Sequence, residues 1–147
     1  MTWEGVGFAT RIDGRMDGDL YLQILKDKLQ ETLEYYGFHP LDIIFQQNNN
    51  PKHTRRKVKE WLEEQEFKTM GWPAQSPDPN PIEHLWGWLK RRLAEYKNPP
   101  NGILELWERV QVEWDKIPVG KCHKSIESMP RRIQAVLRAK GGYTKYW

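Results

Sequence analysis

Two stretches of the sequence decide how the fold is interpreted: Phe45–His53 (FQQNNNPKH) and Ser76–Trp86 (SPDPNPIEHLW). The first begins at the end of an apolar run, Ile43–Phe45, that is typical of a short buried strand. Polar residues at the end of such a strand lie where open α/β sheets usually bind their ligands. The stretches supply two candidate site residues, Asn48 and Glu83, which are separated by the 34 residues 49–82.

The second stretch predicts the start of a helix. Asn80 can cap the helix, Pro81 suits its first position, and Glu83 stands where a capping box needs an acid. Taken alone, these residues favour a capping role for Glu83, because a capping glutamate needs no metal. A catalytic role for Glu83 therefore depends on the rest of the chain.

The remaining sequence predicts alternating strands and helices, which favours an α/β layer fold. We expect strands at 8–10, 41–45 and 67–70, and helices over 17–36, 51–64, 80–96, 103–117 and 121–140. Leucines from Leu22 to Leu33 give the first helix one apolar stripe, and Gly37 can end it in the left-handed conformation. We expect a single domain, 1–147, with a core over 1–97 and a helical C-terminal extension over 98–147.

Composition excludes several classes of protein. A chain of 147 residues has room for one domain with a real core. No apolar run approaches the roughly 18 residues of a membrane span, so we expect no membrane association. The single cysteine, Cys122, excludes an internal disulfide and a cysteine-built zinc site, and the four histidines lack paired spacing. The sequence also lacks a glycine-rich phosphate loop and a glycine-flanked serine elbow.

Basic residues flank both candidate site residues, although the net charge is only +3. One cluster follows the first stretch and the other follows the second: Lys52, Arg55, Arg56 and Lys57, then Lys90, Arg91 and Arg92. A single cluster of this kind is often only a solvated surface. Two clusters around candidate catalytic positions predict a surface that contacts nucleic-acid phosphates.

The two stretches, at this spacing, resemble the DDE catalytic domain of cut-and-paste DNA transposases of the mariner superfamily, on the Tc-type branch whose third acid is glutamate. The resemblance runs from about Trp3 to Trp147 and includes PAQSPD (73–78), ESMPRR (127–132) and GGYTKY (141–146). It implies a ribonuclease-H-like fold that is incomplete at its N-terminal strands and carries extra C-terminal helices. A chain starting in mid-sheet would expose a strand edge where a partner or a second copy of the chain could pair.

The resemblance also implies which residues are catalytic. In the family a strand-end aspartate occupies the position of Asn48, and the helical glutamate corresponds to Glu83. Both positions would bind Mg²⁺ or Mn²⁺, because two-metal strand transfer needs carboxylates that converge on the cations. Asn48 is neutral, and the strand bearing the first aspartate of the family has no counterpart here. We therefore expect a DNA transposition domain that is catalytically defective as it stands, with weak or no metal binding.

Two other interpretations stay open. The chain is either a remnant or domesticated module that binds DNA without cutting it, or a structural module whose tryptophan-rich helices contact other proteins. For the first we expect DNA to be bound through its phosphates without sequence preference, in the nucleus or elsewhere inside the cell. Salt-sensitive DNA affinity separates the DNA-binding interpretations from the structural one.

Overall fold

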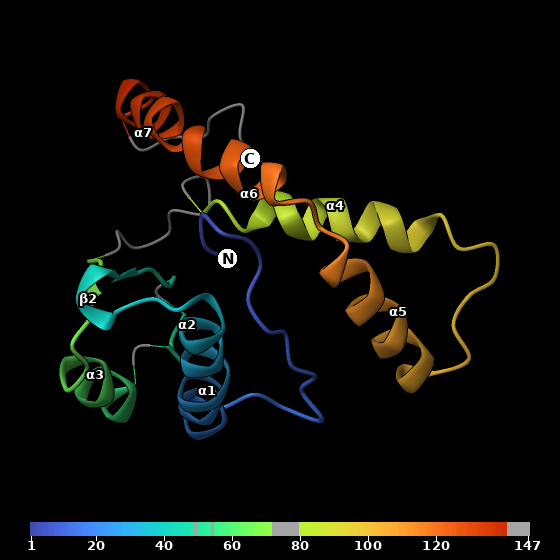
Figure 1. Ribbon diagram of the computed structural model, residues 1–147, viewed down its shortest axis with the longest axis horizontal. Helices are drawn as coiled ribbons and strands as arrows, with labels where there is room; N and C mark the ends of the chain where they lie inside the picture. The colour runs from blue at the N-terminus through green and yellow to red at the C-terminus, as the bar shows by residue number, and fades with distance from the viewer. Residues whose placement is uncertain (49, 54, 72–79, 141–147) are drawn as a thin grey trace. The chain divides into compact units, whose positions relative to one another are not determined.

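The computed structural model describes residues 1–48, 50–53, 55–71 and 80–140 (Figure 1). The described residues form two compact units. Unit 1 contains residues 1–9 and 80–140, and unit 2 contains residues 10–71. Each unit has its own hydrophobic core. The predicted boundary at residue 97 stays a prediction, although helices on both sides of it share the core of unit 1.

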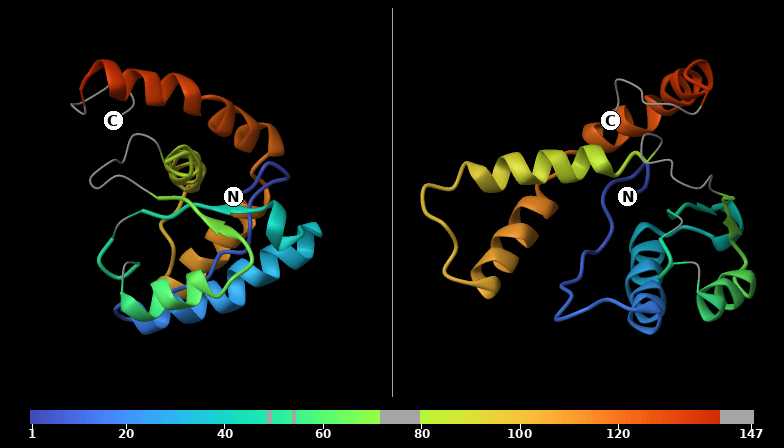
Figure 2. Two further views of the ribbon diagram at one scale, coloured as in Figure 1. Left: turned by 90° about the vertical axis from the view of Figure 1, so that its left-hand side faces the viewer. Right: turned by 180° about the vertical axis from the view of Figure 1, so that it is seen from behind.

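The first regular element of unit 2 is one long helix, made of α1 (Gly18–Ile24), a π-helical turn η1 (Leu25–Leu29) and α2 (Gln30–Tyr36) (Figure 2, left). Asp17 caps its start, because the Asp17 side chain accepts a hydrogen bond from the Leu20 N–H at 2.9 Å. Gly37 ends it with a φ of +65°, a conformation that disfavours residues with a Cβ. The helix predicted over 17–36 is therefore confirmed.

A small parallel sheet follows, made of β1 (Ile44–Phe45) and β2 (Lys68–Thr69), with Ile44 opposite Lys68. The strand predicted over 41–45 is shorter than expected, because Pro40–Asp42 forms a 3₁₀ turn, η2, before it. In that turn His39 Nδ1 accepts a hydrogen bond from the Leu41 N–H at 3.3 Å. The turn leaves only the last two residues of the predicted segment for the sheet.

The strand predicted at 8–10 does not form, so the described sheet has two strands instead of the expected three. The neighbouring segment in unit 1 is held by a side chain and not by a strand ladder. The Trp114 indole Nε1 donates a hydrogen bond to the Gly7 carbonyl oxygen at 2.7 Å. This contact satisfies a backbone acceptor that a neighbouring strand would otherwise bind.

Helix α3 (Arg56–Glu63) covers the core of unit 2. Its inward residues, Val58, Trp61 and Leu62, are buried against Leu25 of η1 and Phe67 next to β2. Burying each such side chain stabilises the fold by roughly 1.5–3 kcal/mol, so α3 and the long helix hold each other in place. The helix predicted over 51–64 is therefore found, although α3 begins five residues later than the predicted residue 51.

Unit 1 is helical and contains α4 (Glu83–Ala94), α5 (Ile103–Asp115), α6 (Val119–Glu127) and α7 (Met129–Arg138). Helix α4 packs against α5 and α6, and the shared core includes Leu85, Leu89, Trp114, Ile117 and Cys122. The helix predicted over 121–140 is divided at Ser128 into α6 and α7. No helix among the described residues is long and apolar enough to cross a membrane.

Candidate catalytic and nucleic-acid-binding site

Asn48 is an exposed residue in the loop that leaves β1 in unit 2. Its side-chain oxygen Oδ1 accepts a hydrogen bond from the Asn50 N–H at 3.1 Å, and Asn50 Oδ1 accepts one from the Lys52 N–H at 3.1 Å. These are consecutive Asx turns, in which a short polar side chain replaces a backbone acceptor. The amide oxygen of Asn48 is therefore uncharged and already hydrogen-bonded within the loop.

Three side chains in contact with one another connect this loop to α1. The Tyr21 hydroxyl of α1 donates to Gln47 Oε1 at 2.7 Å, and Gln47 Nε2 donates to the His53 carbonyl oxygen at 3.2 Å. The Tyr21 and His53 rings stack with centroids 3.9 Å apart. Burial raises the pKa of Tyr21 and lowers the pKa of His53. A hydrogen bond between His53 and the Asn48 backbone raises the pKa of His53, but this effect is smaller than that of burial. Both rings are therefore neutral near pH 7.

Glu83 is the first residue of α4 in unit 1, and its side chain is exposed. The helix starts here because Asn80 Oδ1 accepts the Ile82 N–H at 3.3 Å, which holds residues 80–82 in a turn. Within the part of the chain that the structure describes, the Glu83 carboxylate has no hydrogen bond or ion pair. The capping box that local sequence favours is thus not formed, and the carboxylate is open to a cation.

His84 and Arg132 form a contact that sequence reasoning missed. Arg132 of α7 is 1% exposed, and its Nη2 lies 2.9 Å from Nδ1 and 2.7 Å from Nε2 of His84. Burial lowers the pKa of His84, and the charges of Arg132 and Arg91 lower it further. A neutral imidazole can accept a hydrogen bond from the guanidinium, so this contact holds α7 against the start of α4 beside Glu83.

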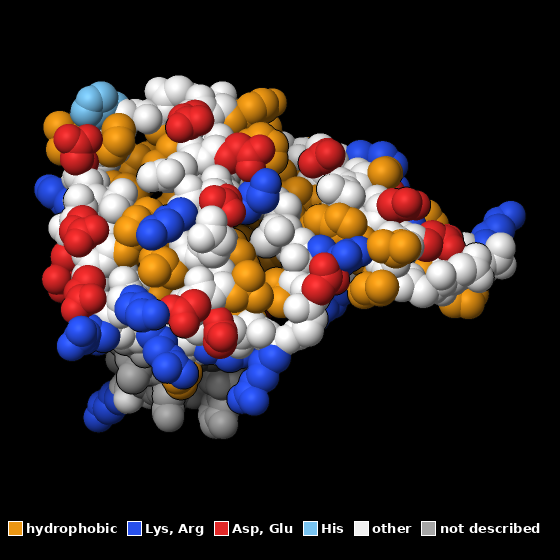
Figure 3. All heavy atoms as spheres, turned by 90° about the horizontal axis from the view of Figure 1, so that it is seen from below, with side chains coloured by type: hydrophobic (Ala, Val, Ile, Leu, Met, Phe, Trp, Pro, Cys, Tyr) orange, Lys and Arg blue, Asp and Glu red, His pale blue; other side chains and the backbone are white. Residues whose placement is uncertain are grey.

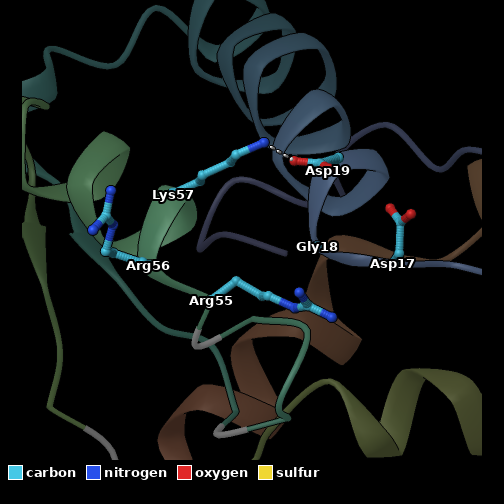
Figure 4. Close-up of a pocket in the computed structure, with 6 residues that line it drawn as sticks. All are labelled: Asp17, Gly18, Asp19, Arg55, Arg56 and Lys57. Atoms are coloured by element: carbon cyan, nitrogen blue, oxygen red, sulfur yellow. Dashed lines mark hydrogen bonds and ion pairs between the residues drawn. The ribbon is translucent and has the colours of Figure 1, made fainter.

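The basic residues predicted near Asn48 differ in how they are partnered. Lys57 Nζ lies 2.9 Å from Asp19 Oδ1, and Arg56 Nε lies 3.0 Å from Glu60 Oε1. Arg55 packs against Gly18, where an added Cβ would come within 2.6 Å of its Cγ. Arg55, Arg56 and Lys57 line a surface pocket of about 310 Å³ together with Asp17, Gly18 and Asp19 (Figure 4). Acidic and basic side chains are interleaved over the face seen in Figure 3.

The basic residues predicted near Glu83 divide in the same way. Lys90 and Arg91 are exposed and form no ion pair with any described residue. Arg92 Nε contacts Glu113 Oε2 at 3.1 Å, and Glu113 is only 2% exposed. The same carboxylate accepts hydrogen bonds from Tyr96 at 3.1 Å and Lys116 at 3.0 Å. Arg92 therefore belongs to a packed polar network between α4 and α5.

The residues described here do not fit a two-metal centre on their own. No group of three or more His, Cys, Asp or Glu side chains that could hold a metal occurs among residues 1–48, 50–53, 55–71 and 80–140. The two predicted ligands supply one free carboxylate, on Glu83, and one neutral amide oxygen, on Asn48. They belong to different units, so their predicted approach to one another stays a prediction. Asp78, the nearest acid to Glu83 on its N-terminal side, lies outside the described residues.

Comparison with known proteins identifies the family. Residues 1–102 match the family model described as DDE superfamily endonuclease. The chain belongs to this family. The chain is 38% identical over 146 residues to the Tc1 transposase of Caenorhabditis elegans, which covers 99% of this chain and 52% of that protein. It is 37% identical over 138 residues to the Tcb2 transposase of Caenorhabditis briggsae, which covers 92% of this chain and 48% of that protein.

Nearly the whole of this chain also matches a solved structure. The catalytic domain of Mos1 transposase, solved with raltegravir and Mg, superposes with a TM-score of 0.84 at 23% identity, over 99% of this chain and 74% of that one. The predicted ribonuclease-H-like fold and the resemblance to mariner-superfamily transposases are therefore confirmed. The DDE domain spans about half the length of the transposable-element transposases that it matches.

Proposed function

We propose that this DDE transposase domain binds DNA through the phosphate backbone but does not cleave or join strands as it stands. The observation that carries the proposal is the identity and surroundings of Asn48. A neutral amide does little to offset the charge of two divalent cations, whereas the chemistry of this family depends on converging carboxylates. The amide oxygen is also engaged by the Asn50 N–H at 3.1 Å.

Divalent metals support the assignment at the level of the family. Mos1 catalytic domains have been solved with Mg and with Mn, and the Mos1 paired-end complex with Mn. We infer that the ancestral form of this site took Mg²⁺ or Mn²⁺, with Glu83 as one ligand and an acid at position 48 as another. Of these two positions only Glu83 supplies a carboxylate in the present chain, so cation binding at them is weak.

DNA is the partner we propose. Mos1 has been solved as a paired-end complex with the left transposon end and as a strand transfer complex. We assign phosphate contacts first to the four predicted cations that form no side-chain ion pair with described residues: Lys52, Arg55, Lys90 and Arg91. Arg56 and Lys57 are in exposed pairs worth at most about 1 kcal/mol each, which a phosphate can replace. A DNA partner places the chain where chromosomal DNA is, which is the nucleus in a eukaryotic cell.

Strand cleavage and joining on labelled DNA with Mg²⁺ or Mn²⁺ test the catalytic part of this proposal. We expect no product from the parent chain or from Asn48→Asp, because the single change restores one ligand only. We expect turnover when an N-terminal strand bearing an aspartate is supplied together with Asn48→Asp. Cutting by the unmodified chain that Glu83→Ala abolishes would show that another carboxylate completes the site.

A protein-contact role is the second candidate, and it has one specific observation in its favour. Helix α7 carries two exposed apolar side chains, Ile133 at 46% and Leu137 at 70%. The two residues are four positions apart and so lie on one face of the helix, and contiguous exposed apolar surface is a mark of protein–protein contact sites. Binding of random-sequence DNA that does not change between ~50 and 200 mM salt would favour this role over phosphate recognition.

A further inference from the structure

The loop that carries Asn48 is fixed at both ends by one closed set of contacts. Tyr21, which is 26 positions away in the sequence, donates to Gln47 at 2.7 Å just before Asn48. Gln47 donates to the backbone oxygen of His53 at 3.2 Å, and the His53 ring stacks back on Tyr21 at 3.9 Å. Three side chains thus connect α1 to the residues on either side of the loop.

The interior of the loop depends on these fixed ends. The His53 N–H donates to the Asn50 carbonyl oxygen at 2.8 Å, and the Lys52 N–H donates to Asn50 Oδ1 at 3.1 Å. These short-range bonds shape the loop, and the contacts of Tyr21 with Gln47 and His53 connect it to helix α1. Groups behind a functional residue commonly set its orientation in this way.

The side chain of Tyr21 is partly buried. The residue packs against the buried cluster of unit 2 and stands four positions before Leu25, which belongs to that cluster. Its hydroxyl is therefore placed in part by apolar packing against residues outside the loop. Removing the oxygen atom alone should leave that packing and the ring stack in place.

We propose that Tyr21, Gln47 and His53 are positioning residues that hold Asn48 and Lys52 where they meet a DNA phosphate. The proposal rests on the proposed function, because it assigns these contacts a role in DNA binding. Tyr21 and Gln47 touch neither DNA nor a cation, and they act through the backbone of the loop. The alternative is that these contacts only satisfy buried polar groups, as most such groups require.

The experiment compares two tyrosine-to-phenylalanine changes in the full chain. Tyr21→Phe removes the hydroxyl that donates to Gln47, whereas Tyr35→Phe removes a hydroxyl from a residue of α2 that is 70% exposed. Backbone hydrogen exchange by NMR reports on the amides of Asn50, Lys52 and His53. We expect Tyr21→Phe to accelerate exchange there by about threefold to tenfold, as for one net hydrogen bond, and Tyr35→Phe to leave it unchanged.

A second variant removes the acceptor of the same hydrogen bond. Gln47→Leu should accelerate exchange at the same amides, and the double change Tyr21→Phe/Gln47→Leu should be no faster than the more severe single change. Anisotropy titrations with a labelled random-sequence duplex then report on function. Tyr21→Phe should lower the salt slope by up to about 0.9, the value of one phosphate contact, because Lys52 is no longer held.

Three results would overturn the proposal. The first is equal exchange at these amides in Tyr21→Phe and Tyr35→Phe. The second is acceleration spread equally over the amides of α1 and α3, which means general destabilisation. The third is faster loop exchange with an unchanged salt slope in a chain that binds DNA. If the parent chain binds no DNA, the proposed function itself fails, and the exchange rates alone decide whether the three residues fix the loop.

Discussion

Arg91 and Arg92 are adjacent arginines of α4 to which the structure gives different roles. Arg92 Nε lies 3.1 Å from Oε2 of Glu113, a residue that is 2% exposed. Arg91 is exposed and has no ion pair among the described residues. We expect Arg91→Gln to weaken DNA binding and leave the fold intact. Arg92→Gln should lower the thermal midpoint, because a buried carboxylate then loses one of its charged donors.

The size of the binding effect follows from the number of unpaired cations. If Lys52, Arg55, Lys90 and Arg91 each contact one phosphate, log affinity falls against log salt with a slope of about −3.6. Affinity then drops by about 150-fold between ~50 and 200 mM salt. Arg91→Gln removes one contact, so the slope becomes about −2.7 and the drop about 40-fold.

Each arginine variant serves as the control for the other, because the chemical change and the helix are the same. Fluorescence anisotropy with a random-sequence duplex gives the salt slope, and thermal unfolding followed by circular dichroism gives the midpoint. Equal slopes for the two variants, with a midpoint that Arg92→Gln does not change, would refute the distinction between a surface cation and a packed one.

Three further predictions concern the metal, the core and acid stability. Asn48→Asp should give measurable Mn²⁺ binding by calorimetry without strand cleavage, and binding that Glu83→Gln leaves unchanged would contradict Glu83 as a co-ligand. Leu85→Ala, at a site 1% exposed, should lower the free energy of unfolding by about 2–5 kcal/mol in urea titrations; a smaller loss would mean that the helices collapse onto the gap. The hydrogen bond from Lys116, with those from Arg92 and Tyr96, lowers the pKa of Glu113 in the folded state. The stabilisation by the ionised Glu113 is therefore present above the usual glutamate pKa of about 4.3, and it is lost as pH falls through the lowered pKa. Glu113→Gln should remove this part of the acid destabilisation, and an unchanged pH profile would refute it.

Local patterns predicted the helices well, because their signals lie within a few residues of each other. Asp17 and Gly37 mark both ends of the first helix, and the inward face of α3 follows from Val58, Trp61 and Leu62. The strand predicted at 8–10 failed because three residues carry little periodic signal. The Gly7 carbonyl next to it is bound by a tryptophan side chain 107 positions away, a contact that no local pattern predicts.

The candidate site shows the same limit. An apolar run followed by polar residues predicted Asn48 at a strand exit, and the structure confirms that placement. The groups that support the site come from distant parts of the chain. Tyr21 lies 26 positions from Gln47, and Arg132 lies 48 positions from His84. Tyr21 has the helical spacing of a core residue, and Arg132 stands in a basic pair, so neither pattern indicates a side chain held beside a site residue.

The amide at position 48 changes the chemistry of the site, whereas the turn that holds it has room for either an amide or an acid. Asn48 Oδ1 accepts the Asn50 N–H at 3.1 Å, and a carboxylate oxygen of aspartate can accept the same bond in the same Asx turn. The loop therefore does not distinguish an amide from an acid, whereas a divalent cation does, because only the acid supplies negative charge. A gain of Mn²⁺ binding in Asn48→Asp, with loop exchange rates equal to those of the parent, would show that the loss of this one metal ligand is a loss of charge and not of loop structure. Altered exchange in that variant would show that the amide had reshaped the loop as well.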